Sequence, residues 1–581
     1  IDKIRRGPSP VLLRLVNTIL FGTRALNLGK EVDLSSITGP ILSDRLPDFE
    51  KISYLFWREL GYRPFKGHTP RSLLFKKYHF TTKVGPNGQA LWTSLADLWL
   101  CSPEIVNHLR IVGGPKLSTY IDGLCKVKDF LSGILPSKGT TLRRLAWFPD
   151  KELKVRVIAI GDFWSQTALK PLHHYLFRVL AKIPQDCTFD QSRFVSQISS
   201  WSVFYSVDLS NATDRFPIQT IFDVLVGHLP REYCESWRWL IVGTPFDFQG
   251  KKVSYQVGNP IGFYSSWASF AVAHHFVMWY CCREIGIQWK DAKYFLLGDD
   301  VLIGDTLLYS KYLEIIGLLG VEVSPIKTHS SDRLFEFTKR LFLNGEEITP
   351  FPVSALREVS KGYHLMVNFL LELEQRGWVL NEGIPQGIRS FYKLVLSRNS
   401  VFSAIMEKKS YFCERIMKVI RGIETAHTAL ISSMRNFNYP NLEISERISD
   451  LIFQSLAIET FTQSIQRSRD YKGPDIVENL LIQITAVEEP SLLEHLVSIT
   501  HYIPQLAVRG QVEELYVRVS KEAFRISVCG EEWPLFLRTM VLPLDDQIFS
   551  TRPDVLTAKA SAVIGNLLKD RLDFLVTPVG R

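Results

Sequence analysis

The sequence lacks several features that mark other classes of protein. Its 581 residues include only 8 cysteines, with no C-x-x-C pair and no spacing typical of secreted disulfide scaffolds. This pattern argues against structural zinc and indicates a reduced intracellular protein. No signal peptide, long low-complexity segment or internal repeat is evident. With 46% hydrophobic and 22% charged residues, the chain instead has the composition of a large globular protein with several subdomains.

A long apolar segment suited to a membrane is also missing. The longest uncharged run includes residues 257–282, which contain two glycines, a proline and the pair His274-His275. This is a poor composition for a membrane-spanning helix, so we expect no integral membrane segment. We predict a Gly/Pro loop followed by a buried helix at residues 266–282, and we interpret both histidines as satisfied core residues.

Acidic residues are scarce in the first third of the chain. Residues 1–200 carry 29 Lys+Arg against 16 Asp+Glu, a net of +13, whereas the other 381 residues carry 39 against 44, a net of −5. Such asymmetry predicts that the first third faces a polyanion, although a solvated basic surface is the alternative. Residues 63–83 contain no acid and interleave aromatic residues, as in a surface that grips phosphates and stacks on bases. The predicted nucleic-acid contacts there are Arg63, Lys66, Arg71, Lys76, Lys77 and Lys83, and the interleaved aromatic residues are Phe65, Phe75, Tyr78 and Phe80.

The tripeptide Gly298-Asp299-Asp300 lies between two short apolar runs, residues 294–297 and 301–303. This layout predicts strand, tight turn and strand. Two carboxylates at one turn repel each other unless a cation lies between them, and Mg²⁺ takes oxygen ligands and suits phosphate chemistry. A simple solvated turn is the alternative, so the interpretation depends on the surroundings.

A second acidic segment, Asp208-Leu-Ser-Asn-Ala-Thr-Asp214, follows a strand-like stretch at residues 202–208. If this strand neighbours the hairpin, Asp208 and Asp299 can share two divalent ions that serve phosphoryl transfer. The alternative for Asp208 is an ordinary strand-end turn or helix cap. Asp214 either caps the helix expected after it or accepts a hydrogen bond from a ribose 2′-hydroxyl.

These segments belong to a longer series of blocks. The blocks are Tyr205-Ser-Val-Asp-Leu-Ser-Asn-Ala-Thr-Asp-Arg-Phe-Pro217, Gly258-Asn-Pro-Ile-Gly-Phe-Tyr-Ser-Ser-Trp267, Leu297-Gly-Asp-Asp300, Gly320-Val-Glu-Val-Ser-Pro-Ile-Lys327 and Phe335-Glu-Phe-Thr-Lys-Arg340. In order and spacing they resemble palm motifs A to E of viral RNA-dependent RNA polymerases, closest to the mitovirus and narnavirus group. Residues 151–160 resemble motif F. The resemblance spans roughly residues 80–355, while residues 1–60 and 360–581 carry no motif that we can place.

The resemblance implies a catalytic centre. Asp208, Asp299 and Asp300 would hold two Mg²⁺ or Mn²⁺ ions, and we expect Asp300 to be the most replaceable of the three. Lys327 would act as general acid toward departing pyrophosphate, a role that the pKa of an unperturbed lysine, near ~10, permits. An ordinary surface lysine is the alternative.

It also implies contacts to nucleotide and RNA. Lys154 and Arg156 share one face of an extended segment by period two and would hold the triphosphate. Phe270 stands where many such polymerases place an Asn that senses the 2′-hydroxyl, so the sugar-sensing network must differ here. The predicted nucleotide-binding residues are Lys154, Arg156, Asp214, Asn211, Ser266 and Gly262, and the further RNA contacts are Gly258, Lys339 and Arg340.

The expected fold is α+β, a right-hand polymerase with an antiparallel palm sheet and a mainly helical C-terminal part. We assign residues 1–200 to an N-terminal region and fingers, and residues 201–355 to the palm, with a fingers insertion within 214–258. Residues 356–581 would form a helical thumb and a C-terminal extension.

The implied function is replication of a viral RNA genome from ribonucleoside triphosphates, with template and product RNA as partners and no capsid protein. The resemblance places the protein in a host mitochondrion. One alternative is a reverse transcriptase of the intron-maturase kind, and another is a genome-binding protein whose catalysis has lapsed.

Overall fold

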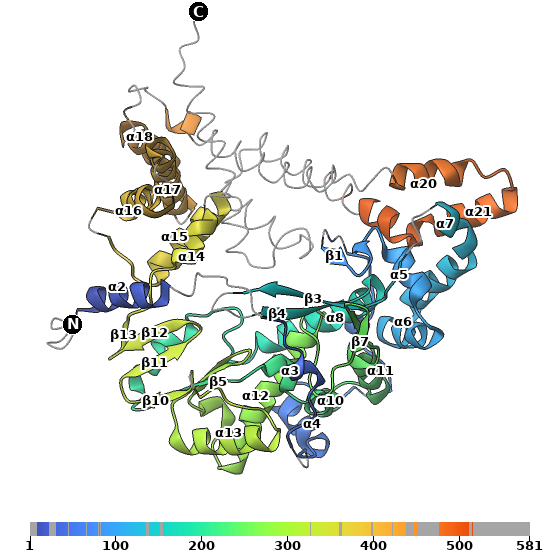
Figure 1. Cartoon of the computed structure of the whole chain (residues 1–581), viewed down its shortest axis with the longest axis horizontal. Helices are drawn as coiled ribbons and strands as arrows, with labels where there is room; N and C mark the ends of the chain where they lie inside the picture. Colours follow the sequence, from blue (N-terminus) through green and yellow to red (C-terminus); the bar gives the residue numbers. More distant parts are fainter. Residues whose placement is uncertain are drawn as a thin grey trace, which may run out of the picture. The chain divides into compact units, whose positions relative to one another are not determined.

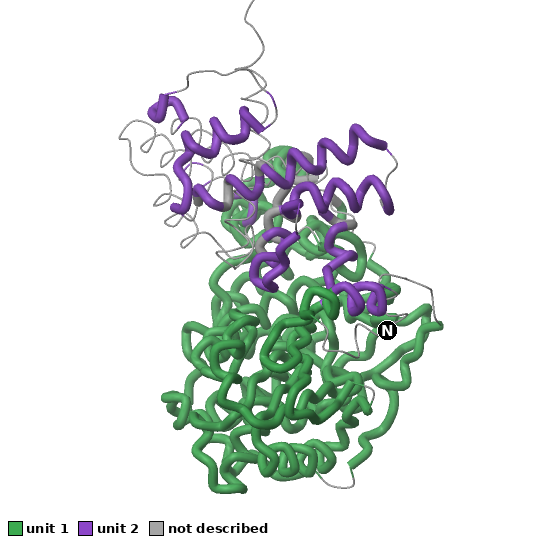
Figure 2. Tube along the Cα trace, turned by 90° about the vertical axis from the view of Figure 1, so that its left-hand side faces the viewer, with its two compact units in different colours: residues 1–14, 26–349, 475–507 green, residues 15–25, 350–474, 508–581 purple. Residues whose placement is uncertain are grey.

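The computed structural model forms an α+β fold (Figure 1). It divides into two compact units, drawn in two colours in Figure 2: residues 1–14, 26–349 and 475–507, and residues 15–25, 350–474 and 508–581. The residues that it describes are 9–22, 31–43, 46–65, 67–79, 81, 83–134, 139–150, 155–325, 327–359, 363–380, 382–396, 399–420, 422–436, 438, 445–449, 476–510, 514 and 517.

The compact units cut across the regions assigned from the sequence, because residues 15–25 group with the second unit. Residues 475–507 group with the first unit rather than with the helices before them. The ring of Tyr502 lies 4.2 Å from that of Tyr120, and Gln505 Nε2 donates to the carbonyl of Trp92 at 3.2 Å. These contacts join the C-terminal helices to the N-terminal third, which no sequence pattern indicated.

The central sheet of the first unit is antiparallel, with strand order β10-β5-β9-β8. Aromatic side chains on one of its faces pack into a core with the neighbouring hairpin, including Phe204, Phe295 and Phe335. Within the stretch expected as a strand at 202–208, residues 204–208 form one, and its side chains are buried or partly buried on both faces of the sheet. The strands are β5 (Phe204–Asp208), β8 (Tyr294–Leu297), β9 (Asp300–Ile303) and β10 (His329–Ser331).

Helix α12 (Ser266–Glu284) is almost wholly buried, as the uncharged run predicted. It packs against α8 (Phe163–Leu180), α10 (Ile218–Val226) and α13 (Thr306–Leu318). Because it lies in the core, it can hold the loops at its N-terminal end rigidly.

A second four-stranded sheet has the order β4-β3-β6-β7. The hairpin of β3 and β4 contains the segment that resembles motif F, and β6 and β7 extend it from within residues 214–258, where an insertion was expected. The strands are β3 (Arg144–Pro149), β4 (Val155–Ile160), β6 (Phe246–Phe248) and β7 (Lys251–Val253).

The first unit also contains smaller strands and further helices. The strands are β1 (Val84–Gly85), β2 (Gly88–Gln89), β11 (Leu334–Phe337), β12 (Arg340–Leu343) and β13 (Glu346–Glu347). The helices are α3 (Ser35–Thr38), α4 (Glu50–Glu59), α5 (Ser94–Leu100), α6 (Pro103–Lys126), α7 (Lys128–Ile134), α9 (Ala212–Arg215), α11 (Arg231–Val242), α20 (Ile476–Thr485) and α21 (Pro490–Ile499), while α2 (Pro10–Leu20) belongs to both units.

The described part of the second unit is helical, which confirms the expectation for this region. Its core includes Leu356, Phe369, Ile388 and Met406. Among the described residues, no helix combines the length and apolar composition that crossing a membrane requires. The helices are α14 (Val353–Val359), α15 (Tyr363–Gln375), α16 (Ile384–Phe391), α17 (Ser400–Ile420) and α18 (Ala426–Asn436).

Candidate active site

The strand register brings the two acidic segments together. Asp208, the last residue of β5, is the direct cross-strand neighbour of Asp300, the first residue of β9. Side chains directly opposite each other have Cβ atoms roughly 4.5–5.5 Å apart. Asp299 occupies the turn between β8 and β9, beside this pair, and Gly298 adopts the left-handed conformation that the turn requires, with φ +64°. The prediction that the two strands are neighbours is confirmed.

The electrostatics of this acidic cluster favour a cation. Burial, followed by the charges of Asp299, Asp208 and Glu336, raises the pKa of Asp300 to about 7. Asp299 keeps an exposed surface at the turn, yet the protein surrounding it removes much of its hydration and raises its pKa too, with Asp208 adding to the effect. Carboxylates that resist joint ionisation are stabilised by a neighbouring positive charge.

Lys327 supplies one such charge. Its ammonium forms an ion pair with Asp208 Oδ2, and its side chain is about half exposed. The backbone brings it there, because Ser324 N donates to the carbonyl of Asp208 at 2.8 Å, while Asp208 N donates to Thr328 Oγ1 at 3.3 Å. Within the described residues, no three His, Cys, Asp or Glu side chains converge closely enough to hold a metal ion. The carboxylate oxygens of the cluster are ligands that suit a hard cation. In this structure Lys327 contacts one of these carboxylates, that of Asp208.

Glu336 is an acidic neighbour that the sequence reasoning missed. It lies on β11, where its backbone N–H donates to Ser206 Oγ at 3.0 Å, and its charge contributes to the raised pKa of Asp300. The sequence did offer a signal for this residue, because Glu336 lies between Phe335 and Phe337 in one strand. Alternation along a strand places the glutamate on the opposite face from the two rings.

Asp214 lies in α9 and does not cap the helix that follows, which begins after Pro217 without a side-chain cap. Its Oδ2 accepts a hydrogen bond from Ser36 Oγ at 2.8 Å, a contact from a distant segment that no pattern indicated. Burial raises its pKa, and within the described residues its buried Oδ1 has no hydrogen-bond partner. Asn211, three residues earlier, is exposed and left-handed with φ +48°.

The glycine loop before α12 packs directly against this segment. Gly258 is buried, and a Cβ atom there would lie 2.3 Å from the carbonyl oxygen of Thr213. Gly262 has φ +119°, and a Cβ there would lie 2.4 Å from the carbonyl oxygen of Ala159. The prediction that these positions allow close backbone approach is therefore confirmed, although the approaching backbone is the chain's own.

Ser266 points into this loop. It is 1% exposed, and its hydroxyl is 2.7 Å from the carbonyl of Pro260 and 2.8 Å from Asn259 Oδ1. Phe270, at the position where many such polymerases have an Asn, is a core residue that packs against Phe216. Its ring has no polar group that could contact a sugar hydroxyl.

Helix α8 holds the loop from its other side, through residues that the sequence reasoning did not single out. Gln166 Nε2 donates to the carbonyl of Gly262 at 2.9 Å, while Gln166 Oε1 accepts from Tyr264 N at 2.8 Å. Ser265 N donates to His173 Nδ1 at 3.3 Å, and burial lowers the pKa of His173 to about 3, so the ring stays neutral and can accept. Spacing alone carries no signal for these contacts.

Most of the basic residues predicted to contact nucleotide or RNA are exposed or half exposed in the described part of the chain. Arg156 on β4 is half exposed and forms an ion pair with Asp150, and its charge offsets part of the rise in the pKa of Asp299. Lys154 and Lys66 lie outside the described residues. The exposed predicted contacts are Arg63, Arg71, Lys76, Lys77, Lys83 and Lys339.

Two expectations about aromatic and basic surface residues need correction. Phe75 and Tyr78 are 4% and 1% exposed, so they are core residues and not a base-stacking surface; Phe80 lies outside the described residues. Arg340 is 7% exposed and donates to both carboxylate oxygens of Glu347, so it is an internal ion pair at the start of β12. Alternation along a segment does not by itself decide which side chains point outward.

Parts of this sequence are similar to known proteins. The RNA-directed RNA polymerase of Cryphonectria parasitica mitovirus 1 is 32% identical over 291 residues, which cover 45% of this chain and 34% of that protein. Two uncharacterized mitochondrial proteins of Arabidopsis thaliana are each 31% identical, over 206 residues (32% of this chain, 79% of the plant protein) and over 151 residues (25% and 74%). The chain thus aligns with about a third of the length of the mitovirus polymerase.

A solved structure, the RNA-dependent RNA polymerase of a human picorbirnavirus, aligns with 51% of this chain and 64% of its own at a TM-score of 0.33 and 13% identity. Residues 72–426 match the protein family described as Mitovirus RNA-dependent RNA polymerase. This match covers more than half of the chain, which therefore belongs to the mitovirus RNA-dependent RNA polymerase family.

Proposed function

We propose that this chain catalyses RNA-templated synthesis of RNA from ribonucleoside triphosphates and thereby replicates a viral RNA genome. The observation that carries the proposal is the pairing of Asp208 with Asp300 across β5 and β9, with Asp299 at the adjoining turn. Family membership supports the same reaction.

Divalent-metal dependence is general in this family, and we propose two Mg²⁺ or Mn²⁺ ions here. Asp208, Asp299 and Asp300 would hold them, because their carboxylates are hard oxygen donors whose mutual repulsion a cation relieves. When bound, such ions activate a 3′-hydroxyl and stabilise the charge on the transferred phosphoryl and the departing pyrophosphate.

Lys327 would serve the leaving group. Its ammonium already lies at the carboxylate cluster, paired with Asp208. Once cations balance Asp208, the same ammonium can donate a proton to departing pyrophosphate.

The incoming nucleotide would contact both ends of the site. Arg156, with Lys154, would bind the triphosphate, since its charge reaches Asp299. Asp214 would accept from the ribose 2′-hydroxyl through the oxygen that Ser36 leaves unsatisfied, with Asn211 beside it.

RNA would run along the exposed basic residues. We propose Gly258 and Arg340 as internal supports rather than RNA contacts, because both are buried. The proposed RNA contacts are Arg63, Arg71, Lys76, Lys77, Lys83 and Lys339.

We propose residues 201–355 as the palm, with the fingers before it in the sequence and a helical thumb after it.

The test is primer extension on a defined RNA template with Mg²⁺ or Mn²⁺. Incorporation of ribonucleotides that is abolished by chelation and by Asp208→Asn supports the proposal. Preference for deoxynucleotides would assign the chain to reverse transcription instead. Absence of incorporation in a folded chain that still binds RNA would indicate a genome-binding protein.

We also propose that the protein works in a host mitochondrion without a capsid protein. The mitovirus relative and the mitochondrial plant relatives support the location. UGA codons at some of the 13 tryptophans of the coding RNA would support mitochondrial translation, whereas UGG alone at all of them would count against it. Loss of bound RNA from the purified protein at physiological salt would count against retention of the genome without a capsid.

A further inference from the structure

His274 lies beneath the catalytic hairpin, completely buried in α12. Its Nδ1 is 2.8 Å from the carbonyl oxygen of Gly298, the residue before Asp299. Its Nε2 is 2.8 Å from the hydroxyl of Tyr312 on α13. One imidazole therefore links the catalytic turn to two helices of the core.

The chemistry of these contacts defines the proton positions. A carbonyl oxygen can only accept, so His274 Nδ1 carries a hydrogen and donates it to Gly298. Burial lowers the pKa of His274 to about 3, and burial raises the pKa of Tyr312 well above its usual value. The imidazole is thus neutral and the phenol protonated, so Nε2 accepts from Tyr312.

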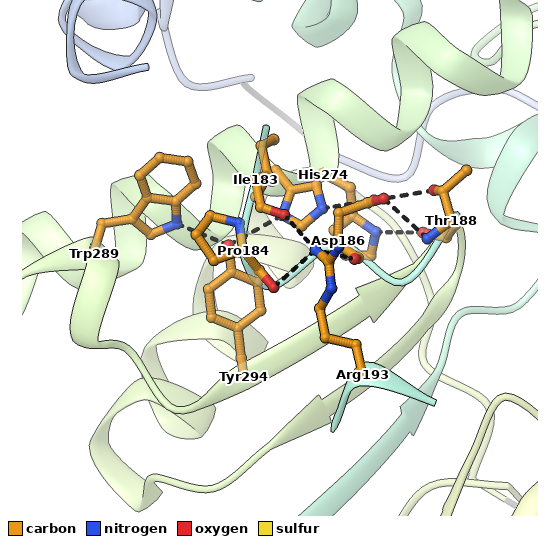
Figure 3. Close-up of polar contacts among 10 residues, drawn as sticks. Ile183, Pro184, Asp186, Thr188, Arg193, His274, Trp289 and Tyr294 are labelled. Carbon is orange, nitrogen blue, oxygen red and sulfur yellow. Dashed lines mark hydrogen bonds and ion pairs between the residues drawn. The ribbon is translucent and has the colours of Figure 1, made fainter. Parts of the chain in front are cut away.

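The next histidine makes a separate connection. His275 Nδ1 is 3.0 Å from the hydroxyl of Tyr294, at the start of β8, and its Nε2 is 3.1 Å from Asp186 Oδ2. Figure 3 shows the indole of Trp289 pointing toward the same hydroxyl, to which it donates at 2.7 Å. Both histidines are satisfied core residues, as the sequence predicted, but only His274 contacts the turn.

The turn needs such an anchor. Gly298 is left-handed, and the charges of Asp299 and Asp300 repel each other. A hydrogen bond to the Gly298 carbonyl restrains the peptide that joins Gly298 to Asp299, and with it the direction in which Asp299 leaves the backbone.

We propose that His274, held by Tyr312, is a positioning residue that orients the Gly298–Asp299 peptide so that Asp299 can hold a divalent cation. The inference deepens the proposed function and rests on it. Removal of the Nδ1 hydrogen bond should weaken metal binding while leaving the helices around it intact.

Two amide substitutions separate this role from simple packing. The amide nitrogen of asparagine falls near the position of imidazole Nδ1, whereas that of glutamine falls near Nε2. His274→Asn can therefore keep the bond to Gly298, while His274→Gln keeps only the contact with Tyr312. Both bury one amide at the same position, so their general cost to folding is comparable.

The measurement is the Mg²⁺ concentration for half-maximal incorporation by the full chain, together with the melting temperature. We expect His274→Gln to raise this concentration about 10-fold, the usual effect of losing a group that supports a metal ligand, and His274→Asn to restore most of it. Equal Mg²⁺ requirements in wild type and both variants would overturn the proposal. The proposal would also be overturned if the Mg²⁺ requirement rose in proportion to the loss of melting temperature and His274→Asn did not restore it.

A tyrosine pair keeps the test decisive if the histidine variants fail to fold. Tyr312→Phe removes the hydroxyl that holds His274, and Tyr294→Phe removes an equally buried hydroxyl that contacts His275 and Trp289 instead. We expect both to lower the melting temperature, but only Tyr312→Phe to raise the Mg²⁺ requirement. An identical requirement in the two would refute the inference.

Failure of the proposed function looks different. If wild type incorporates no ribonucleotide, or if Asp208→Asn is fully active, the polymerase assignment itself falls. If those controls behave as expected and the His274 and Tyr312 variants keep the wild-type Mg²⁺ requirement, only the positioning role falls.

Discussion

The molecule presents two acidic turns at strand ends, and they are held in different ways. The first, residues 298–300, is anchored from below by His274, a neutral and fully buried imidazole on a core helix. The second, residues 211–214, consists of Asn211 and the single helical turn of α9 that carries Asp214, and it is anchored by Ser36, whose hydroxyl lies on a short, partly buried N-terminal segment. A buried anchor on a long helix restrains its turn more tightly than a single hydroxyl on a surface segment.

The difference matches the proposed tasks. Metal ligands need a fixed direction, because coordination geometry tolerates little displacement. A carboxylate that accepts a hydrogen bond from a sugar hydroxyl needs only one of its oxygens to be correctly placed. The N-terminal segment supports the second turn further, because Arg215 donates to the carbonyls of Gly39 and Pro40 at 3.0 and 2.6 Å.

The largest effect is expected at the first turn. Asp299→Asn should lower incorporation about 1,000-fold or more, roughly 4 kcal/mol of transition-state stabilisation, because it removes a proposed metal ligand. Asp300→Asn should cost less. Primer extension with matched protein amounts checks both.

An exposed carboxylate provides the control for this prediction. Asp332 is 70% exposed and forms an ion pair with its neighbour Arg333, so Asp332→Asn should leave incorporation unchanged. Equal losses in the Asp299 and Asp332 variants would remove the distinction between a catalytic turn and any other acidic turn.

The packing beneath the second turn gives the next effect. Gly258→Ala should destabilise the protein by about 3 kcal/mol, because the new Cβ would lie 2.3 Å from the carbonyl of Thr213, and backbone cannot easily move aside. Chemical denaturation measures the free energy of unfolding. The control is Gly317→Ala on α13, where nothing lies within 4 Å of the new Cβ and the substitution should be neutral or slightly stabilising.

Sugar selection should respond to the hydroxyl that holds the second turn. Ser36→Ala should reduce the preference for ribonucleotides over deoxynucleotides roughly 3- to 10-fold, since one hydrogen bond to a charged group is lost. The comparison of NTP and dNTP incorporation measures it. Ser35→Ala is the matched control, because the Ser35 hydroxyl donates to Asp33 and not to Asp214. Equal preferences in the two variants would contradict the role of Ser36.

The smallest effect is a pH dependence at the second turn. Folding raises the pKa of Asp214 through burial, so the folded state binds this proton more tightly than the unfolded state. Stability from this group is present below its usual value of 3.8 and is lost as pH rises through the raised pKa. Asp214→Asn should therefore gain stability relative to wild type as pH rises from about 4.

Denaturation curves of wild type and Asp214→Asn at several pH values check this sign. A difference that shrinks as pH rises would mean that Asp214 is stabilised as a carboxylate, contrary to its burial. The hydrogen bond from Ser36 would then outweigh the effect of burial on Asp214, and the contrast between the two turns would be lost.

Much of the site was predictable because its chemistry is local. A tight turn between two apolar runs places Asp299 at a hairpin tip, and alternation puts Asp208 at the end of a buried strand. The long uncharged run predicted the buried helix that carries His274, with boundaries close to those observed. Residues 1–60 offered no such pattern, so the segment that holds Asp214 could not be anticipated.

The errors have one physical cause. Phe75, Tyr78 and Arg340 lie in segments that mix aromatic and basic residues, and such a composition does not show which of the side chains face inward. Only neighbouring elements settle the direction, as Glu347 does for Arg340.

By itself, the sequence determined the acidic hairpin, the strand before it, the buried helix and the family, because each depends on residues close together in the chain. The tertiary structure alone decided that Ser36 holds Asp214, that Glu336 joins the carboxylate cluster and that His274 anchors Gly298. These contacts join residues from separate elements, and a hydrogen bond depends on where two atoms meet in space rather than on any spacing along the chain.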